Sequence, residues 1–224
     1  MRAWENHVPF VACIQQVSAV YYLQNKSMNP NPTSIPRLAP PGAGLPTIER
    51  LVAQAMIRWK AARTSREQAA IAFEAERVAI LRLLDGQDPG AQAQPVLIKR
   101  LPGLEDSSRY WSLLMVVDHL RIVNREIAQV IADLGRGHRP DREASIAAVK
   151  PSPQVTHAVV AAFDHGCRAF AATVASVAEL KTALAFPHPW FGPMDAAAWH
   201  VMAGFHMHLH HRQMKRIVRG LAKG

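Results

Sequence analysis

Apolar positions recur every three or four residues in four regions of the chain, a spacing typical of amphipathic helices. The first region extends from Thr47, which we expect to be the helix N-cap, to a stop at Asp85-Gly86. Thr64-Ser65 interrupts this region. The pattern therefore predicts either one long bent helix or a pair of helices.

The other three regions are separated from the first, and from one another, by segments rich in proline and glycine. The second region begins at Ser107 or Ser108 and ends near residues 135–137, and the third occupies about residues 154–184. The last region begins at Asp195, an N-cap, and ends near residue 220. Amphipathic helices joined by such loops predict an all-α fold of the four-helix-bundle type.

The first 45 residues do not share this pattern. Six of the sixteen prolines lie between Met28 and Pro46, together with two glycines, a composition typical of a linker. We therefore expect residues 1–45 to form a disordered or extended tail and residues 46–224 to form the helical domain. Little before Met28 has the pattern of a folded unit, so Met28 is an alternative start of the chain.

Composition narrows the class of protein. Hydrophobic residues make up 49% of the chain, which is enough for a sizeable core. No stretch approaches the roughly 20 uninterrupted apolar residues that a membrane span requires. The two cysteines, Cys13 and Cys167, form neither a disulfide framework nor a CxxC zinc motif. We expect a cytoplasmic protein with no membrane partner.

The formal net charge of +9 raises the question of an anionic partner. The charges are scattered, however, and the dense group at the C-terminus is what a helix dipole favours. This group consists of Arg212, Lys215, Arg216, Arg219 and Lys223. Phosphate binding is the alternative function of these cations. Because there is no zinc finger and no aromatic-basic motif, we do not expect a nucleic-acid partner.

Histidines provide the candidate chemistry. The chain has eleven, and five lie between residues 200 and 211. His206 and His210 are four residues apart, which places them one turn apart on the same helix face. Two imidazoles in this relation can bind one divalent ion. His208 points away from that face, and His211 lies about 100° from His210 around the helix.

A third ligand has to come from another helix, and the best candidate is His119 on the apolar side of the second region. Asp118 and Glu126 are nearby carboxylates that could orient a ligand or serve as a general base. Gln213 shares the ligand face of the last helix, and we expect it to hydrogen-bond there. Without a metal, His119 would be a hydrogen-bonded core residue and the other histidines would face solvent.

A compound motif near the C-terminus extends this pattern. It consists of His188-Pro-Trp-Phe-Gly-Pro-Met, Trp199 and His206-x-x-x-His210-His211-Arg-Gln213. The motif resembles the C-terminal signature of the DinB/YfiT-like superfamily, most closely its HPxFGPL branch. The segment Trp111-Ser112…Asp118-His119-Leu120 resembles the motif that supplies this family's first histidine. The resemblance covers about residues 47–220.

The resemblance implies a four-helix bundle in which three histidines hold a divalent metal ion, one from the second helix and two from the fourth. Carried over to this sequence, they are His119, His206 and His210. Zinc, nickel, iron and manganese all suit a three-imidazole site. Members of known activity include thiol-dependent transferases and isomerases that use bacillithiol, mycothiol or glutathione.

Two functions are consistent with these features. In the first, a metal with an open position activates a nucleophile, either to transfer a low-molecular-weight thiol or to hydrolyse a substrate. The alternative is a non-catalytic metal-binding bundle in a stress response or an interaction, acting as a homodimer or with a partner. The ending His211-Arg212-Gln213 lacks the glycine of the commoner HHxGQ ending, which weakens any transfer of substrate from the family.

Overall fold

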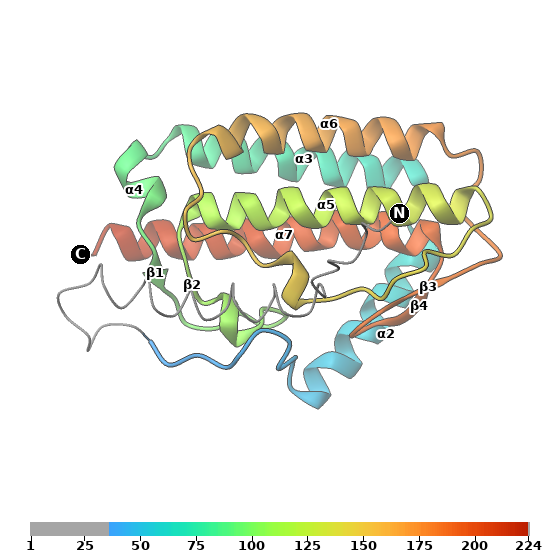
Figure 1. The fold of residues 1–224 in the computed structure, drawn as a ribbon, viewed down its shortest axis with the longest axis horizontal. Helices are drawn as coiled ribbons and strands as arrows, with labels where there is room; N and C mark the ends of the chain where they lie inside the picture. The colour runs from blue at the N-terminus through green and yellow to red at the C-terminus, as the bar shows by residue number, and fades with distance from the viewer. Residues whose placement is uncertain (1–35, 224) are drawn as a thin grey trace, which may run out of the picture. The chain divides into compact units, whose positions relative to one another are not determined.

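Four long helices form the bundle in the computed structural model, which describes residues 36–223 (Figure 1). They are α3 (Arg66–Asp85), α5 (Leu113–Gly135), α6 (Ala158–Ser176) and α7 (Ala196–Leu221). Helix α5 packs against both α6 and α7, and α3 packs against α7. The predicted all-α four-helix bundle is confirmed.

The connection between α5 and α6 determines which helices are parallel. Residues 136–157 run back along the bundle, with a single 3-10 turn, η2 (Ala147–Val149), on the way (Figure 1). Helix α6 therefore runs in the same direction as α5, whereas α7 runs antiparallel to α5. This crossover brings η2 against α5, where it reaches the histidines described below.

Capping explains where the first helices begin and end. The interruption at Thr64-Ser65 separates α2 (Thr47–Arg63) from α3, so the region is a pair of helices. The Ser65 side chain accepts a hydrogen bond from the backbone of Gln68, whose side chain bonds back to Ser65 in a capping box. The predicted N-cap at Thr47 is wrong, because Thr47 is already helical and Pro46 precedes the helix without a side-chain cap.

Helix α5 begins later than the pattern indicates. Residues Asp106–Ser108 form a 3-10 turn, η1, and Tyr110–Trp111 form strand β2, which pairs with β1 (Val96–Leu97). The N-cap of α5 is Ser112, which accepts from the backbone N–H of Met115. A short helix, α4 (Pro89–Ala93), precedes β1. Residues before Ser112 that the pattern assigned to the helix are therefore in η1 and in the β1–β2 pair instead.

A second hairpin leads into α7. Strands β3 (Phe186–His188) and β4 (Gly192–Met194) are antiparallel, and Gly192 has a φ of 73°, which favours glycine in this tight turn. Helix α6 ends at Ser176, earlier than predicted, because Val177 is extended. The predicted N-cap Asp195 is confirmed: its carboxylate accepts from the backbone of Ala198.

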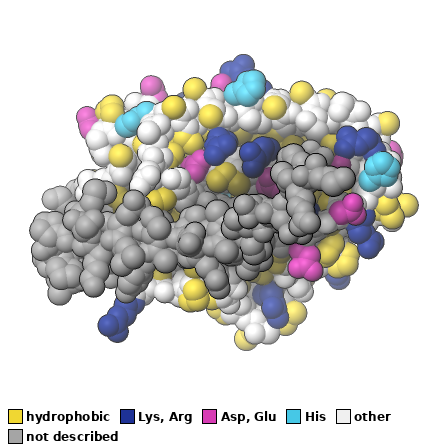
Figure 2. All heavy atoms as spheres, in the orientation of Figure 1, with side chains coloured by type: hydrophobic (Ala, Val, Ile, Leu, Met, Phe, Trp, Pro, Cys, Tyr) yellow, Lys and Arg dark blue, Asp and Glu magenta, His cyan; other side chains and the backbone are white. Residues whose placement is uncertain are grey.

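Apolar side chains fill the space between the four helices. Phe73 of α3 stacks on Phe170 of α6, with ring centroids 4.3 Å apart. On the described part of the face shown in Figure 2, basic side chains lie singly or in small groups among acidic and apolar ones.

None of the described helices combines the length and the hydropathy needed to cross a membrane.

Most of the predicted tail, including the alternative start at Met28, lies outside the described residues. The described residues 38–46 contain no helix or strand. The backbone N–H groups of Gly42 and Gly44 donate to the carboxylate of Glu105, which ties this segment to the loop after β1. The boundary between tail and domain at residues 45–46 stays a prediction.

Candidate metal centre

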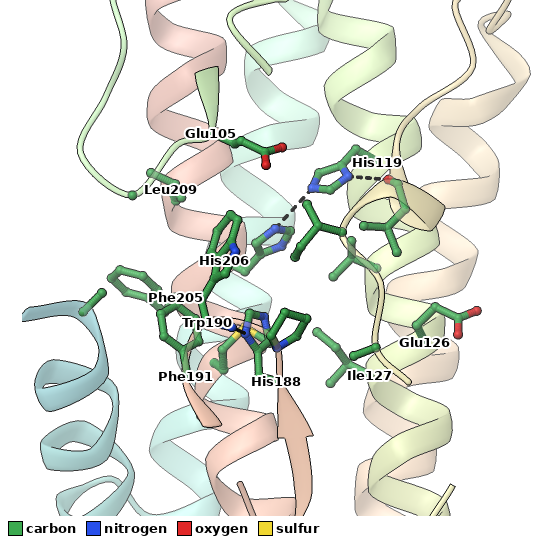
Figure 3. Close-up of a pocket in the computed structure, with 18 of the residues that line it drawn as sticks. Glu105, His119, Glu126, Ile127, His188, Trp190, Phe191, Phe205, His206 and Leu209 are labelled. Atoms are coloured by element: carbon green, nitrogen blue, oxygen red, sulfur yellow. Dashed lines mark hydrogen bonds between the residues drawn. The ribbon is translucent and has the colours of Figure 1, made fainter. Parts of the chain in front are cut away.

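Three imidazoles converge between α5 and α7. His119 projects from α5 and His206 from α7 (Figure 3). His210 lies one turn beyond His206 on α7. One ligand nitrogen from each ring lies within 4.8 Å of the other two. The Nε2 atoms of His119 and His206 are 3.2 Å apart. The antiparallel packing of α5 on α7 therefore brings together the three residues that the sequence singled out.

Hydrogen bonds fix two of the rings. His119 Nδ1 donates to the backbone carbonyl of Val149 at 2.6 Å, and His210 Nδ1 donates to Gln213 Oε1 at 2.7 Å. Gln213 Nε2 in turn donates to the carbonyl of Ser108. Because a neutral imidazole carries one proton, these bonds leave Nε2 of His119 and of His210 with a free lone pair. The expectation that Gln213 bonds on the ligand face is confirmed.

The third ring has an unsatisfied nitrogen. His206 Nδ1 is buried and has no hydrogen-bond partner among the described residues. Its other nitrogen, Nε2, faces Nε2 of His119. An unpaired buried polar atom destabilises the fold, so its presence here marks a place where the fold is arranged for something other than stability.

Burial keeps the three rings uncharged. Burial, together with the nearby Lys150, lowers the pKa of His119 to about 4, against the opposing effect of the bond to Val149. Burial also holds the pKa values of His206 and His210 well below the ordinary value, and the neighbouring histidines add to this effect. All three imidazoles are therefore neutral at pH 7, which is the form that can bind a metal ion.

An ion pair that the sequence did not indicate lies beside the histidines. Lys150 Nζ donates to Glu105 Oε2 at 2.6 Å and to the hydroxyls of Ser107 and Ser108 at 2.7 and 3.1 Å. Its ammonium lies 5.3 Å from the ring centroid of Trp111, which itself packs against His119 and His210. Both charged residues come from irregular segments, where hydrophobic periodicity carries no signal.

The two candidate carboxylates have other partners. Asp118 is buried and accepts hydrogen bonds from Arg121 and from the backbone of Ser152, so it anchors the crossover connection. Glu126 pairs with Arg142 at 2.7 Å, and Figure 3 shows its carboxylate turned away from His119 and His206. Within the described residues, neither carboxylate has a hydrogen bond to an imidazole, although Glu126 lines the cavity that adjoins the three rings.

Two other histidines of α7, His208 and His211, face a different helix. His208 and His211 both donate from Nδ1 to the carboxylate of Glu76 on α3, each at 2.7 Å. His208 is exposed and points away from the three converging rings, as its position along the helix indicates. The histidine-rich sequence of α7 therefore serves two separate sites.

A cavity of about 550 Å³ adjoins the three rings. The β3–β4 hairpin forms part of its wall through His188, Trp190 and Phe191. His188 Nδ1 accepts from the backbone N–H of Trp190, and the His188 ring stacks on Phe191 with centroids 4.5 Å apart. The tight turn of this motif thus places its aromatic side chains at the cavity (Figure 3).

Comparisons with known proteins support the architecture. No protein-family model matches the chain, and neither does any curated protein. Among solved structures, the chain is similar to the crystal structure of TT2238, described as a four-helix bundle protein, with a TM-score of 0.51 and 26% identity over 67% of this chain and 98% of the other. Fold and site together define a four-helix bundle with a buried three-histidine cluster that could hold a metal ion.

Proposed function

We propose that the protein binds one divalent metal ion through His119, His206 and His210, and that the bound ion acts on a ligand in the adjoining cavity. The observation that carries this proposal is the convergence of three neutral imidazoles from two helices.

Distances support the proposal. Nitrogen ligands lie about 2.0–2.1 Å from zinc, so two of them in tetrahedral geometry are separated by about 3.3 Å. The Nε2 atoms of His119 and His206 are separated by 3.2 Å. The spacing of this pair therefore fits two ligands of one ion.

The groups behind the ligands support it as well. Metal-bound histidines commonly donate their second ring N–H to a carbonyl or a carboxylate, which orients the ring. Val149 accepts such a bond from His119, and Gln213 accepts one from His210. Two of the three rings therefore have an orienting acceptor, whereas Nδ1 of His206 has none among the described residues. The sequence resemblance to the DinB/YfiT-like superfamily points to the same three residues.

The chemistry that such an ion would supply follows from its charge. Three neutral ligands leave a divalent ion its full positive charge, which lowers the pKa of a bound water to about 7 or stabilises a bound thiolate. We therefore propose transfer of a low-molecular-weight thiol to an electrophile, or metal-assisted hydrolysis, as the reaction class. Zinc, nickel, iron and manganese are the candidate ions.

Metal analysis of purified variants tests this proposal. We expect the wild-type protein to contain about one equivalent of metal and His210→Ala to contain little. His208→Ala is the matched control, because His208 lies on the same helix but bonds to Glu76. Equal metal content in wild type and His210→Ala, with both proteins folded by circular dichroism, would refute the site.

A second candidate function is a non-catalytic interaction bundle, and one observation favours it. One face of α2 exposes large apolar side chains: Ile48, Leu51, Val52 and Trp59 are 78%, 56%, 63% and 56% exposed. Exposed apolar groups of this kind are typical of interfaces, here a homodimer. Sedimentation analysis of Leu51→Glu tests the dimer: a monomer in place of a wild-type dimer supports it. Thiol-dependent turnover that is lost in folded His206→Ala would favour the enzyme, and unaltered turnover in that variant would refute the metal-dependent mechanism.

A further inference from the structure

We infer that the cavity beside the three histidines takes a ligand with an apolar body, such as an acyl chain, whose polar head group lies at the metal. The position of the head group rests on the proposed metal site. The inference of an apolar ligand body depends only on the residues that line the cavity. This inference adds a substrate class to the proposed reaction.

One wall is a continuous stripe of α5 that begins at the metal ligand. Ile122, Val123, Ile127 and Val130 all line the cavity. They follow His119 at intervals of three, four, eight and eleven residues, which places them on one side of the helix. From His119 to Val130 the helix rises about 16 Å, so an apolar surface extends well beyond the histidines.

The facing wall is also apolar. Phe205 and Leu209 of α7 line the cavity beside His206, and Trp190 and Phe191 enter from the β3–β4 hairpin (Figure 3). Aromatic and aliphatic walls with a few convergent polar groups are typical of small-molecule sites, which usually measure about 300–1,000 Å³. The cavity of about 550 Å³ falls within this range.

The charged residues of the cavity are already paired or lie at its edge. Glu105 is bonded to Lys150, whose other donors go to serine hydroxyls. Glu126 pairs with Arg142, and Glu49 pairs with Arg100 at 2.6 Å. The other charged lining residues of the described chain, Arg125, Glu143 and Arg212, are exposed.

This arrangement disfavours a highly polar ligand body. A molecule with several charged groups would lose hydration along the apolar walls without gaining partners there. An acyl chain or an aromatic ring would instead exchange water for contact with α5 and α7. The polar atoms that still need a partner are at the three imidazoles, where His206 Nδ1 has no hydrogen bond within the described residues.

Two series of small ligands test the inference on the full-length protein. Acetohydroxamic and hexanohydroxamic acid share a metal-binding head group, and acetamide and hexanamide are matched ligands without it. Each buried CH₂ group strengthens binding about fourfold, so the four added groups should strengthen it on the order of 200-fold. We expect this gain in both series by calorimetry on zinc-loaded protein, and tighter binding of hydroxamates than of amides.

Two variants locate the effect. Phe205→Gln, in the cavity wall, should reduce the chain-length gain about tenfold or more, because the added amide leaves the wall partly polar. Ile71→Gln is the control, because Ile71 is 70% exposed on α3 and does not line the cavity. A gain that Phe205→Gln leaves unchanged would mean that the chains bind elsewhere, which would overturn the inference.

The series also separates this inference from the proposed metal site. If the hexanoyl ligands bind no better than the acetyl ligands while hydroxamates still bind better than amides, the metal site stands and the apolar body is wrong. If hexanamide gains over acetamide but the protein holds no metal, the head-group position and the proposed function are both wrong. The wild-type protein alone decides these outcomes.

Discussion

Helix α7 carries two histidine clusters that differ in almost every physical respect. His206 and His210 face α5 and converge with His119, and His119 and His210 are buried while His206 is partly buried. His208 and His211 face α3 and share the carboxylate of Glu76. In the first cluster the second ring nitrogen of two histidines is bonded to a neutral oxygen acceptor. The comparison teaches that convergence and burial define the candidate metal centre, since a high density of histidines is common to both clusters.

Removal of a ligand should produce the largest difference between the clusters. His119→Ala removes the only ligand from α5 and should weaken metal binding by more than about 100-fold, since loss of a supporting residue alone typically costs 10–100-fold. His211→Ala should leave affinity within about twofold, because its partner is Glu76. Titration with a metal-competing chelator measures both. An unchanged affinity in His119→Ala would show that the ion is held without α5.

Acidification should separate the clusters next. Burial lowers the pKa of His119 to about 4, below the value of about 6.5 in an unfolded chain. The unfolded state therefore binds more protons between these values, and the stability present above pH 6.5 is lost as the pH falls toward 4. His119 alone should cost metal-free protein about 2 kcal/mol between pH 7 and pH 5.

Urea unfolding at pH 7, 6 and 5 measures this loss. His119→Gln should reduce the pH dependence by about 2 kcal/mol, because glutamine does not titrate in this range, while the other histidines with lowered pKa values still contribute. Ile71→Gln is the control, because Ile71 carries no titratable group and is 70% exposed on α3. A wild-type stability that does not change over this range would contradict neutral burial of His119.

Loss of a supporting bond should have a smaller effect. Gln213→Ala removes the acceptor of His210 Nδ1 and the donor to the carbonyl of Ser108. We expect metal affinity to fall about tenfold or more, as is typical when a ligand loses its orienting partner. Glu76→Ala removes the corresponding partner of the other cluster and should leave metal affinity unchanged. A similar loss in both variants would indicate a general effect of α7 stability.

The variant with the smallest expected effect, Asp195→Ala, tests directly whether the stability of α7 influences metal binding. Asp195 caps α7 through the backbone of Ala198, far from both clusters along the helix. Asp195→Ala should lower the free energy of unfolding by about 1 kcal/mol. The metal affinity of the folded protein should stay unchanged, as measured by the same chelator titration. If the metal affinity of Asp195→Ala also fell, then metal binding would depend on the stability of α7 as a whole.

Local patterns predicted the helices well where a cap or an uninterrupted apolar stripe was present. Asp195 begins α7 as predicted, and Thr64-Ser65 divides the first region into two helices. The pattern failed where other hydrogen bonds compete for the same residues. Because β2 pairs with β1 before Ser112, α5 begins later along the chain than predicted. Because the backbone at Val177 is extended, α6 ends before the predicted residue.

The sequence by itself determined the pair on α7, because a separation of four residues on a helix places His206 and His210 on one face wherever that helix lies. It also identified His119 as a buried histidine in need of a partner. Only the tertiary structure decided that the carbonyl of Val149 and the Glu105–Lys150 pair stand beside these rings. Val149 comes from the 3-10 turn η2, and Glu105 and Lys150 come from irregular segments. The positions of such segments depend on packing against the helices and leave no periodic signal in the chain.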